Sequence, residues 1–189
     1  MFNKKILAGV GSVFVACALS APAGALAKEP AAVPAATVAG LSKADQKIVT
    51  DMAVANMAEV AAGKMALGKT QNADVKTFAQ KMVDDHTKAL ADVTALAQTK
   101  AVTLPADVDE PHKKMAAKLD KLSGDAFDKA YMADAGVSDH SKVHAKLKGF
   151  ASKAKDADVK ALAAKMLPTV EEHLTLAKDM HGKHAAKAK

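Results

Sequence analysis

The chain has 189 residues, of which 50% are apolar and 25% charged, and its formal net charge is +6. This length accommodates one domain with its own hydrophobic core, and no change in composition along the chain indicates a second domain. Aromatic residues make up only 3% and tryptophan is absent, which favours helices over sheets, while the single cysteine excludes an internal disulfide and a cysteine-rich metal site.

The first residues have the pattern of a secretory signal peptide. Residues 1–5 are basic, residues 6–16 are mostly apolar, and residues 25–27 (Ala-Leu-Ala) have the small side chains of a signal peptidase site. We therefore predict a signal peptide over residues 1–27, cleavage near Ala27, and a mature protein in the periplasm or outside the cell. The apolar run is too short to span a membrane, which takes about 20 residues. Cleavage before Cys17 would instead give a lipoprotein, but residues 14–16 match a lipoprotein leader poorly.

The rest of the chain divides into three segments. Residues 28–41 predict a flexible linker, because they are rich in alanine and proline. Residues 42–182 predict a helical domain, and residues 183–189 form a tail that contains lysine and histidine.

Apolar residues at alternating spacings of three and four predict four long helices. Ser42 and Asp45 resemble a capping box at the start of the first helix, while Asn72 and Asp156 are suitable N-caps for the second and fourth. In the third helix Ala133, Val137, His140 and His144 fall on one line. The first three helices are expected to span residues 42–69, 72–101 and 125–153, and the fourth to continue to the end of the domain.

The segment between the second and third helices predicts a long crossover. Pro105 and Pro111 bracket a non-helical stretch, and Pro111 is well placed as the first residue of a short helix that ends before Ser123 and Gly124. The predicted fold is therefore an all-α four-helix bundle with a long crossover that contains a short extra helix.

Each long helix is expected to place one polar residue at the same position along the bundle axis. Glu59 and His86 are symmetric about the first turn, and His140 and His173 are symmetric about the last turn. If the crossover places these turns at opposite ends, the two pairs lie about 20 and 25 Å from those ends, at about 1.5 Å per residue. These depths add up to the length of one long helix, so both pairs are expected to meet near the middle of the bundle.

A carboxylate and three imidazoles in a helical core are a suitable site for a divalent transition metal such as Zn, Fe, Cu or Ni. We predict Glu59, His86, His140 and His173 as the ligands, with His144 as an alternative to His140. The neighbouring acidic residues are candidates to accept the second N–H of a histidine: Asp85, Asp139 and Glu172.

Other interpretations of these four residues remain open. They can form a buried hydrogen-bonded network that fixes the helix register, with or without a trapped water, or one of them can face solvent. A standard di-iron centre is not expected, because Val83 and Val170 stand where its two Glu-x-x-His motifs need glutamate. The spacing of Met52, Met82, Met166 and Met180 indicates core packing and requires no copper-binding role.

The basic residues give little indication of a partner. All of them are lysine and none is arginine, and few aromatics accompany them, which argues against nucleic-acid binding. The mild positive charge is compatible with weak association with acidic surfaces of the cell envelope, and a homo-oligomer is a further expectation.

Several short stretches together resemble one family of exported bacterial proteins, known as domain of unknown function 4142. The resemblance covers residues 44–180 and implies a ferritin-like bundle and an envelope location, but no established activity. This sequence has His144 where such proteins have a variable, often apolar residue. The matching stretches are Met57-Ala58-Glu59-Val60, Phe78-Ala79, Met82-Val83, Asp85-His86, Leu104-Pro105, Leu122-Ser123-Gly124, Phe127-Asp128, Tyr131, Asp139-His140, Leu167-Pro168 and His173-Leu174.

The sequence therefore favours a non-enzymatic helical bundle of the bacterial envelope that binds a transition-metal ion in its core. One alternative is a structural or stress-protective interaction protein with a buried polar network and no metal. A second alternative is a metal-dependent oxidase or peroxidase, because a metal held by few protein ligands keeps an open coordination position.

Overall fold

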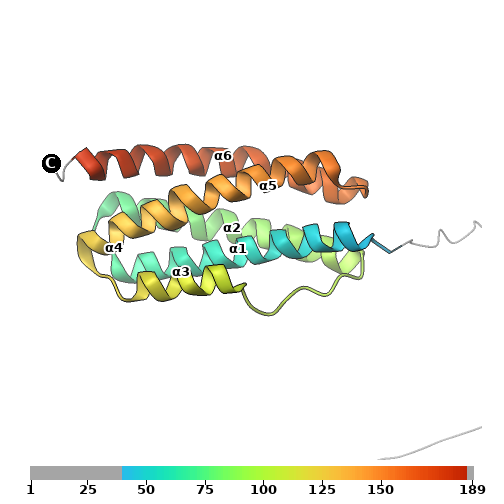
Figure 1. The fold of residues 1–189 in the computed structure, drawn as a ribbon, viewed down its shortest axis with the longest axis horizontal. Coiled ribbons are helices and arrows are strands. Elements are labelled where there is room, and N and C mark those ends of the chain that lie inside the picture. Colours follow the sequence, from blue (N-terminus) through green and yellow to red (C-terminus); the bar gives the residue numbers. More distant parts are fainter. Residues whose placement is uncertain (1–39, 187–189) are drawn as a thin grey trace, which may run out of the picture. The chain divides into compact units, whose positions relative to one another are not determined.

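A computed structural model describes residues 40–186 of the chain (Figure 1). The predicted signal peptide, Cys17 and most of the predicted linker lie outside the described residues. All regular elements of the described part are helices, which confirms the all-α prediction. None of these helices is long and apolar enough to span a membrane. The elements are α1 (Lys43–Lys69), α2 (Ala73–Thr99), α3 (Glu110–Asp120), α4 (Gly124–Tyr131), the π-helical segment η1 (Met132–Asp139), α5 (His140–Lys153) and α6 (Ala157–Ala186).

The four long helical segments form two antiparallel pairs, α1 with α2 and α5 with α6 (Figure 1). The turn between α1 and α2 and the turn between α5 and α6 lie at opposite ends of the bundle. The crossover returns along α1, and its short helix α3 lies on the outside of the bundle. This arrangement confirms the predicted bundle with a long crossover.

Side-chain caps begin the helices where the sequence predicted them. The Ser42 hydroxyl accepts the Asp45 backbone N–H at 3.1 Å, and Asn72 Oδ1 accepts the Asp74 N–H at 2.9 Å. Asp156 Oδ1 accepts the Asp158 N–H at 2.9 Å at the start of α6. Each cap satisfies a donor that the first turn of a helix leaves unpaired.

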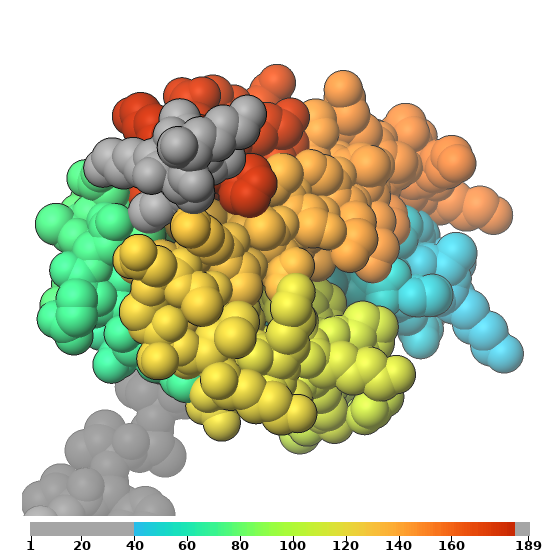
Figure 2. All heavy atoms as spheres, turned by 60° about the vertical axis from the view of Figure 1, so that its left-hand side comes forward, coloured from blue at the N-terminus to red at the C-terminus, as the bar shows by residue number. Residues whose placement is uncertain are grey.

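Two apolar clusters fill the bundle, one toward each end. One cluster lies beside the turn from α1 to α2, and in it Phe127 stacks on Tyr131. The side chains of α4 cover this end of the bundle (Figure 2). Between the clusters lies a layer of buried polar side chains, each less than 9% exposed. Its members are Asn56, Glu59, His86, Asp139, His140 and His173.

The segment before α5 differs from the predicted continuous α-helix, because Met132–Asp139 is π-helical. Its buried residues recur every four positions, at Ala135 and Asp139, which is a longer period than the 3.6 residues of an α-helix. Ala133 and Val137, which α-helical spacing places on the core stripe, are therefore only half-buried. The π-helical turn changes the direction from which the following residue, His140, enters the core.

Asp45 connects the start of α1 to the turn between α5 and α6. Its carboxylate is buried and accepts the backbone N–H groups of Lys155 at 3.0 Å and Asp156 at 3.2 Å. Asp45→Ala leaves both donors without this partner, so we expect it to lower the free energy of unfolding by about 2 kcal/mol. Urea denaturation measures this change. Asp51→Ala is the matched control, because Asp51 makes only an exposed ion pair with Lys47, and a change within about 0.5 kcal/mol is expected.

Candidate metal centre

Three histidines from three helices meet in the polar layer. His86 of α2, His140 of α5 and His173 of α6 are at most 4% exposed. One ring nitrogen of each lies within 4.8 Å of the other two. The ring centroids are 5.2 to 5.4 Å apart. Histidines from distant parts of the sequence therefore converge on one buried point.

The orientation of His86 is set by Asn56 of α1. Asn56 Nδ2 donates to the Met52 carbonyl oxygen at 2.7 Å, which turns its Oδ1 toward His86 Nδ1 at 2.9 Å. An amide oxygen only accepts, so the proton of His86 resides on Nδ1. His86 Nε2 is therefore unprotonated and directs its lone pair at the other histidines.

His140 is oriented by the π-helical segment. Its Nδ1 lies 2.9 Å from the carbonyl oxygen of Ala135, five residues earlier in the chain. Because this carbonyl only accepts, Nδ1 carries the proton and Nε2 is unprotonated. His140 Nε2 faces His86 Nε2 at 3.4 Å.

His173 has the opposite tautomer. Its Nε2 lies 2.9 Å from Asp85 Oδ2, and Asp85 in turn pairs with Lys81 at 3.1 Å. Burial alone would raise the pKa of Asp85, but the hydrogen bonds from His173 and Lys81 lower it, so the carboxylate is ionised and accepts. The proton of His173 is therefore on Nε2. Its Nδ1 is buried and has no hydrogen-bond partner among the described residues.

Each ring proton is thus directed at an oxygen acceptor, which leaves one unprotonated nitrogen on each ring: His86 Nε2, His140 Nε2 and His173 Nδ1. Burial lowers the pKa of His86 to about 3 and that of His140 to about 4. Burial also lowers the pKa of His173, despite the neighbouring Asp85. All three rings are neutral near pH 7, so none supplies a proton to another. Buried acceptors that face each other without a donor are costly.

A metal ion fits this arrangement. Ligating histidines typically donate their second N–H to a carbonyl, amide or carboxylate oxygen, as all three do here. Two imidazole nitrogens bound at about 2.0–2.1 Å with tetrahedral angles are about 3.4 Å apart, which is the separation of His86 Nε2 and His140 Nε2. A cavity of about 10 Å³ adjoins these two histidines, enough for about one water molecule.

Glu59, the fourth predicted ligand, lies on the other side of His140. Its Oε1 is 3.4 Å from His140 Nδ1, the protonated nitrogen that points away from the three-histidine centre. Burial raises the pKa of Glu59 well above its usual value, and Asp139 raises it further by its charge and hydrogen bond. The raised pKa favours the neutral form of Glu59, whose side chain contacts His140 Nδ1 and also lines the small cavity beside His86 and His140.

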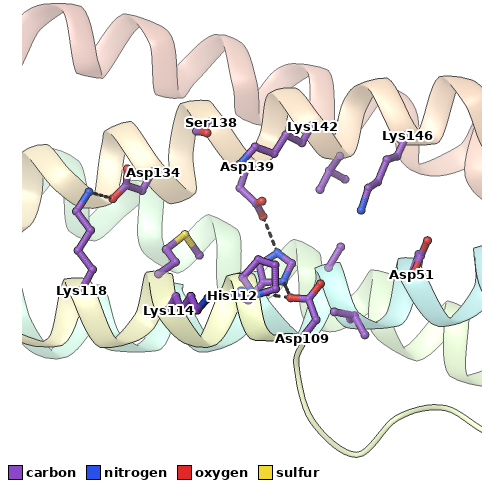
Figure 3. A pocket seen from close by; sticks show the side chains of 15 residues that line it. Asp51, Asp109, His112, Lys114, Lys118, Asp134, Ser138, Asp139, Lys142 and Lys146 are labelled. Carbon is purple, nitrogen blue, oxygen red and sulfur yellow. Dashed lines mark hydrogen bonds and ion pairs between the residues drawn. The ribbon is translucent and has the colours of Figure 1, made fainter.

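Asp139 connects Glu59 to the surface. His112 of α3 donates from Nε2 to Asp139 Oδ2 at 3.3 Å, and its Nδ1 pairs with Asp109 (Figure 3). Burial alone would raise the pKa of Asp139, but the hydrogen bonds from His112 and Glu59 lower it. The Asp139 bond also raises the pKa of His112. Asp139 is therefore an ionised acceptor for two donors.

The remaining predicted residues are farther from the three-histidine centre. Glu172 is exposed and pairs with Lys81, which links it to Asp85. His144 is half-buried and is not among the described residues that group around the lone pairs. Sequence reasoning missed Asn56 and His112. Asn56 lies one helical turn before Glu59, so its spacing already placed it on the same face of the helix.

Asn56→Leu tests whether the amide fixes the His86 ring. The substitution removes the Oδ1 acceptor but keeps a similar volume, so His86 is free to rotate or to change tautomer. We expect the affinity for Zn(II) to fall about 10- to 100-fold, as for other groups that orient a ligand, and competition with a chromophoric chelator measures it. Gln80→Leu makes the same change on the exposed face of α2 and serves as the control. Equal affinities for the two variants would show that Asn56 does not orient His86.

Solved structures with the same fold include two forms of CopM and a DUF305 protein. CopM in the Cu(II)-bound form matches with a TM-score of 0.62 and 15% identity, over 74% of this chain and 96% of CopM. CopM in the Cu(I)-bound form matches with a TM-score of 0.61 and 13% identity, over 74% of this chain and 96% of that one. The DUF305 protein from Streptomyces coelicolor matches with a TM-score of 0.63 and 18% identity, over 75% of this chain and 94% of that one. At these identities the likeness shows a shared helical-bundle fold.

The sequence comparisons give the family. No curated protein has significant sequence similarity to the chain. The family model described as "Domain of unknown function (DUF4142)" matches residues 30–180, which is most of the chain, and the chain therefore belongs to this family.

Proposed function

We propose that this protein binds one transition-metal ion through His86 Nε2, His140 Nε2 and His173 Nδ1. The observation that carries the proposal is the set of three hydrogen-bonded ring tautomers, which leaves one unprotonated nitrogen on each of three neutral, buried histidines whose ligand atoms lie within 4.8 Å of one another. A hydrogen-bonded network without metal accounts less well for this set, because such a network needs a donor for each acceptor. The copper-bound state of CopM, which shares the fold, further supports metal binding.

The donor set selects the class of metal. Three imidazoles suit Zn, Cu, Ni and Fe, whereas Mg and Ca prefer oxygen ligands. Glu59 lines the small cavity beside His86 and His140, but its raised pKa favours the neutral form, which is a weaker ligand than a carboxylate. We therefore propose a mononuclear site of the Zn or Cu type, with the water-sized cavity beside His86 and His140 as its fourth position.

Metal binding or delivery fits this centre better than catalysis on an organic molecule. The three histidines are almost completely buried, the cavity beside His86 and His140 has about 10 Å³, and a surface groove that reaches His86 has about 150 Å³. Both are smaller than typical small-molecule sites, which have about 300–1,000 Å³. The N-terminal sequence pattern supports export, so we propose that binding takes place in the periplasm or outside the cell.

Metal analysis of the mature protein tests the proposal. The chain is produced without a histidine tag, incubated with Zn(II), Cu(II), Ni(II), Co(II) or Fe(II), desalted and measured by mass spectrometry of the elements. We expect about one tightly bound ion per chain for at least one of these metals, with a rise in melting temperature. Protein that retains none of them and shows no thermal shift with any would overturn the proposal.

A further inference from the structure

A surface groove between α2 and α6 leads toward the three-histidine centre. It has a volume of about 150 Å³, and it also reaches Asn56 of α1. Its outer part is lined by charged residues, among them Lys88 and an ion pair of 2.9 Å between Lys165 and Asp92. Its inner part is lined by His86, a predicted ligand, and by Met166.

Met166 lies between this groove and the small cavity beside the histidines. Three residues line both spaces: Asn56, His86 and Met166. Asn56 and His86 hydrogen bond to each other, and Met166 is the one sulfur-bearing side chain of the three. Met166 is 8% exposed and lies seven residues before His173, which places both side chains on the same face of α6. An ion that moves from the groove to the histidines therefore passes the Met166 side chain.

The other buried methionines lack this position. Met52, Met82 and Met132 are at most 2% exposed, and none of them lines the groove or the small cavity. Core packing accounts for all three. Met166 also belongs to an apolar core cluster, but unlike these residues it borders both the groove and the small cavity beside the histidines.

A thioether is a weak donor toward Zn(II) but a suitable one toward Cu(I). Soft sulfur ligands select soft monovalent copper, whereas imidazole accepts several metals. A methionine at the inner end of the groove therefore adds a preference for Cu(I) over divalent ions, which the three histidines alone do not have.

We infer that the metal enters through the groove between α2 and α6, and that the Met166 thioether is a further donor that gives the centre a preference for Cu(I) over divalent ions. This inference rests on the proposed metal-binding function and specifies the ion.

The test compares Met166→Leu with Met82→Leu in the full mature chain. Exchange of methionine for leucine conserves volume and typically costs less than about 1.5 kcal/mol, so both variants are expected to fold. Affinity is measured for Ag(I), a redox-inert substitute for Cu(I), and for Co(II). For Met166→Leu we expect the Ag(I) affinity to fall about tenfold or more and the Co(II) affinity to stay within about twofold. For Met82→Leu we expect neither affinity to change.

A second readout uses methionine methyl groups labelled with carbon-13. Ag(I) is expected to shift the methyl signal of Met166 and to leave those of Met52 and Met82 in place. The inference is overturned if the Met166 signal does not respond, or if Met166→Leu weakens Ag(I) and Co(II) binding equally. Wild-type protein that binds Co(II) but not Ag(I) overturns the inference and leaves the three-histidine site intact, whereas protein that binds neither Ag(I) nor any of the five divalent ions named above overturns both proposals.

Discussion

Replacing His86 with alanine is expected to weaken Zn(II) binding by more than about 100-fold. The loss of a metal ligand reduces affinity more than the loss of a group that only orients a ligand. His86 Nε2 is one of only three unprotonated ring nitrogens of the centre, and the two remaining imidazoles hold an ion much less tightly. The variant also leaves Asn56 Oδ1 without its partner, so we expect the free energy of unfolding of the metal-free protein to fall by about 2 kcal/mol. Chelator competition measures the affinity, and circular dichroism shows whether the helices remain.

His144→Ala is the matched control for this variant. His144 lies one helical turn after His140 and is half-buried, so it was the alternative ligand in the sequence. Because His144 is outside the three-histidine group, we expect its removal to change the Zn(II) affinity by less than about threefold. Loss of binding in His144→Ala with normal binding in His86→Ala would show that the ion is bound elsewhere.

Acidification is expected to destabilise the metal-free protein through its buried histidines. Burial lowers the pKa of His86 to about 3 and that of His140 to about 4, while in the unfolded chain both titrate near their usual value of 6.5. Between pH 6.5 and about pH 4 the unfolded state therefore binds more protons, so stability falls as the pH falls. Each of these two rings contributes a loss of about 2 kcal/mol by pH 4.5.

Glu59 acts in the opposite direction. Its pKa is raised in the folded protein, so above pH 4.5 the unfolded state releases this proton more readily than the folded state does. This difference lowers the stability of the folded protein at pH 7, and acidification toward pH 4.5 reduces the effect. Glu59→Gln keeps a neutral side chain in place and eliminates this compensation. Urea denaturation at pH 7 and pH 4.5 should therefore show a loss of stability in the wild type and a larger loss in Glu59→Gln. Stability that does not decrease toward pH 4.5 in either protein would contradict neutral, buried histidines.

Much of the fold follows from local sequence patterns. Ser42, Asn72 and Asp156 are helix caps because their side-chain oxygens satisfy nearby backbone donors, and this chemistry involves only two to three residues. The proline-bracketed crossover and the apolar stripes likewise depend on short-range spacing. The π-helical segment could not be predicted in this way. It packs against α6, with Gly136 close to the Ala177 side chain, and such a contact between distant segments leaves no local sequence signal.

The candidate site was only partly accessible from sequence. Symmetric positions about the two turns gave a common height for His86, His140 and His173, because the helix rise per residue is constant. The side of His140 on which Glu59 lies could not be predicted, as it depends on helix rotation and on the π-helical turn. The ring tautomers depend on Asn56, Asp85 and the Ala135 carbonyl, which come from three different helical segments.

The most direct test of the account observes the ring nitrogens themselves. In metal-free protein with nitrogen-15 in its histidines, NMR should show unprotonated nitrogens at His86 Nε2, His140 Nε2 and His173 Nδ1, and one equivalent of Zn(II) should shift these three signals while their N–H partners remain protonated. Signals of these rings that do not respond to Zn(II), Co(II) or Ag(I), or a response confined to His144, would contradict a metal centre at this point in the bundle.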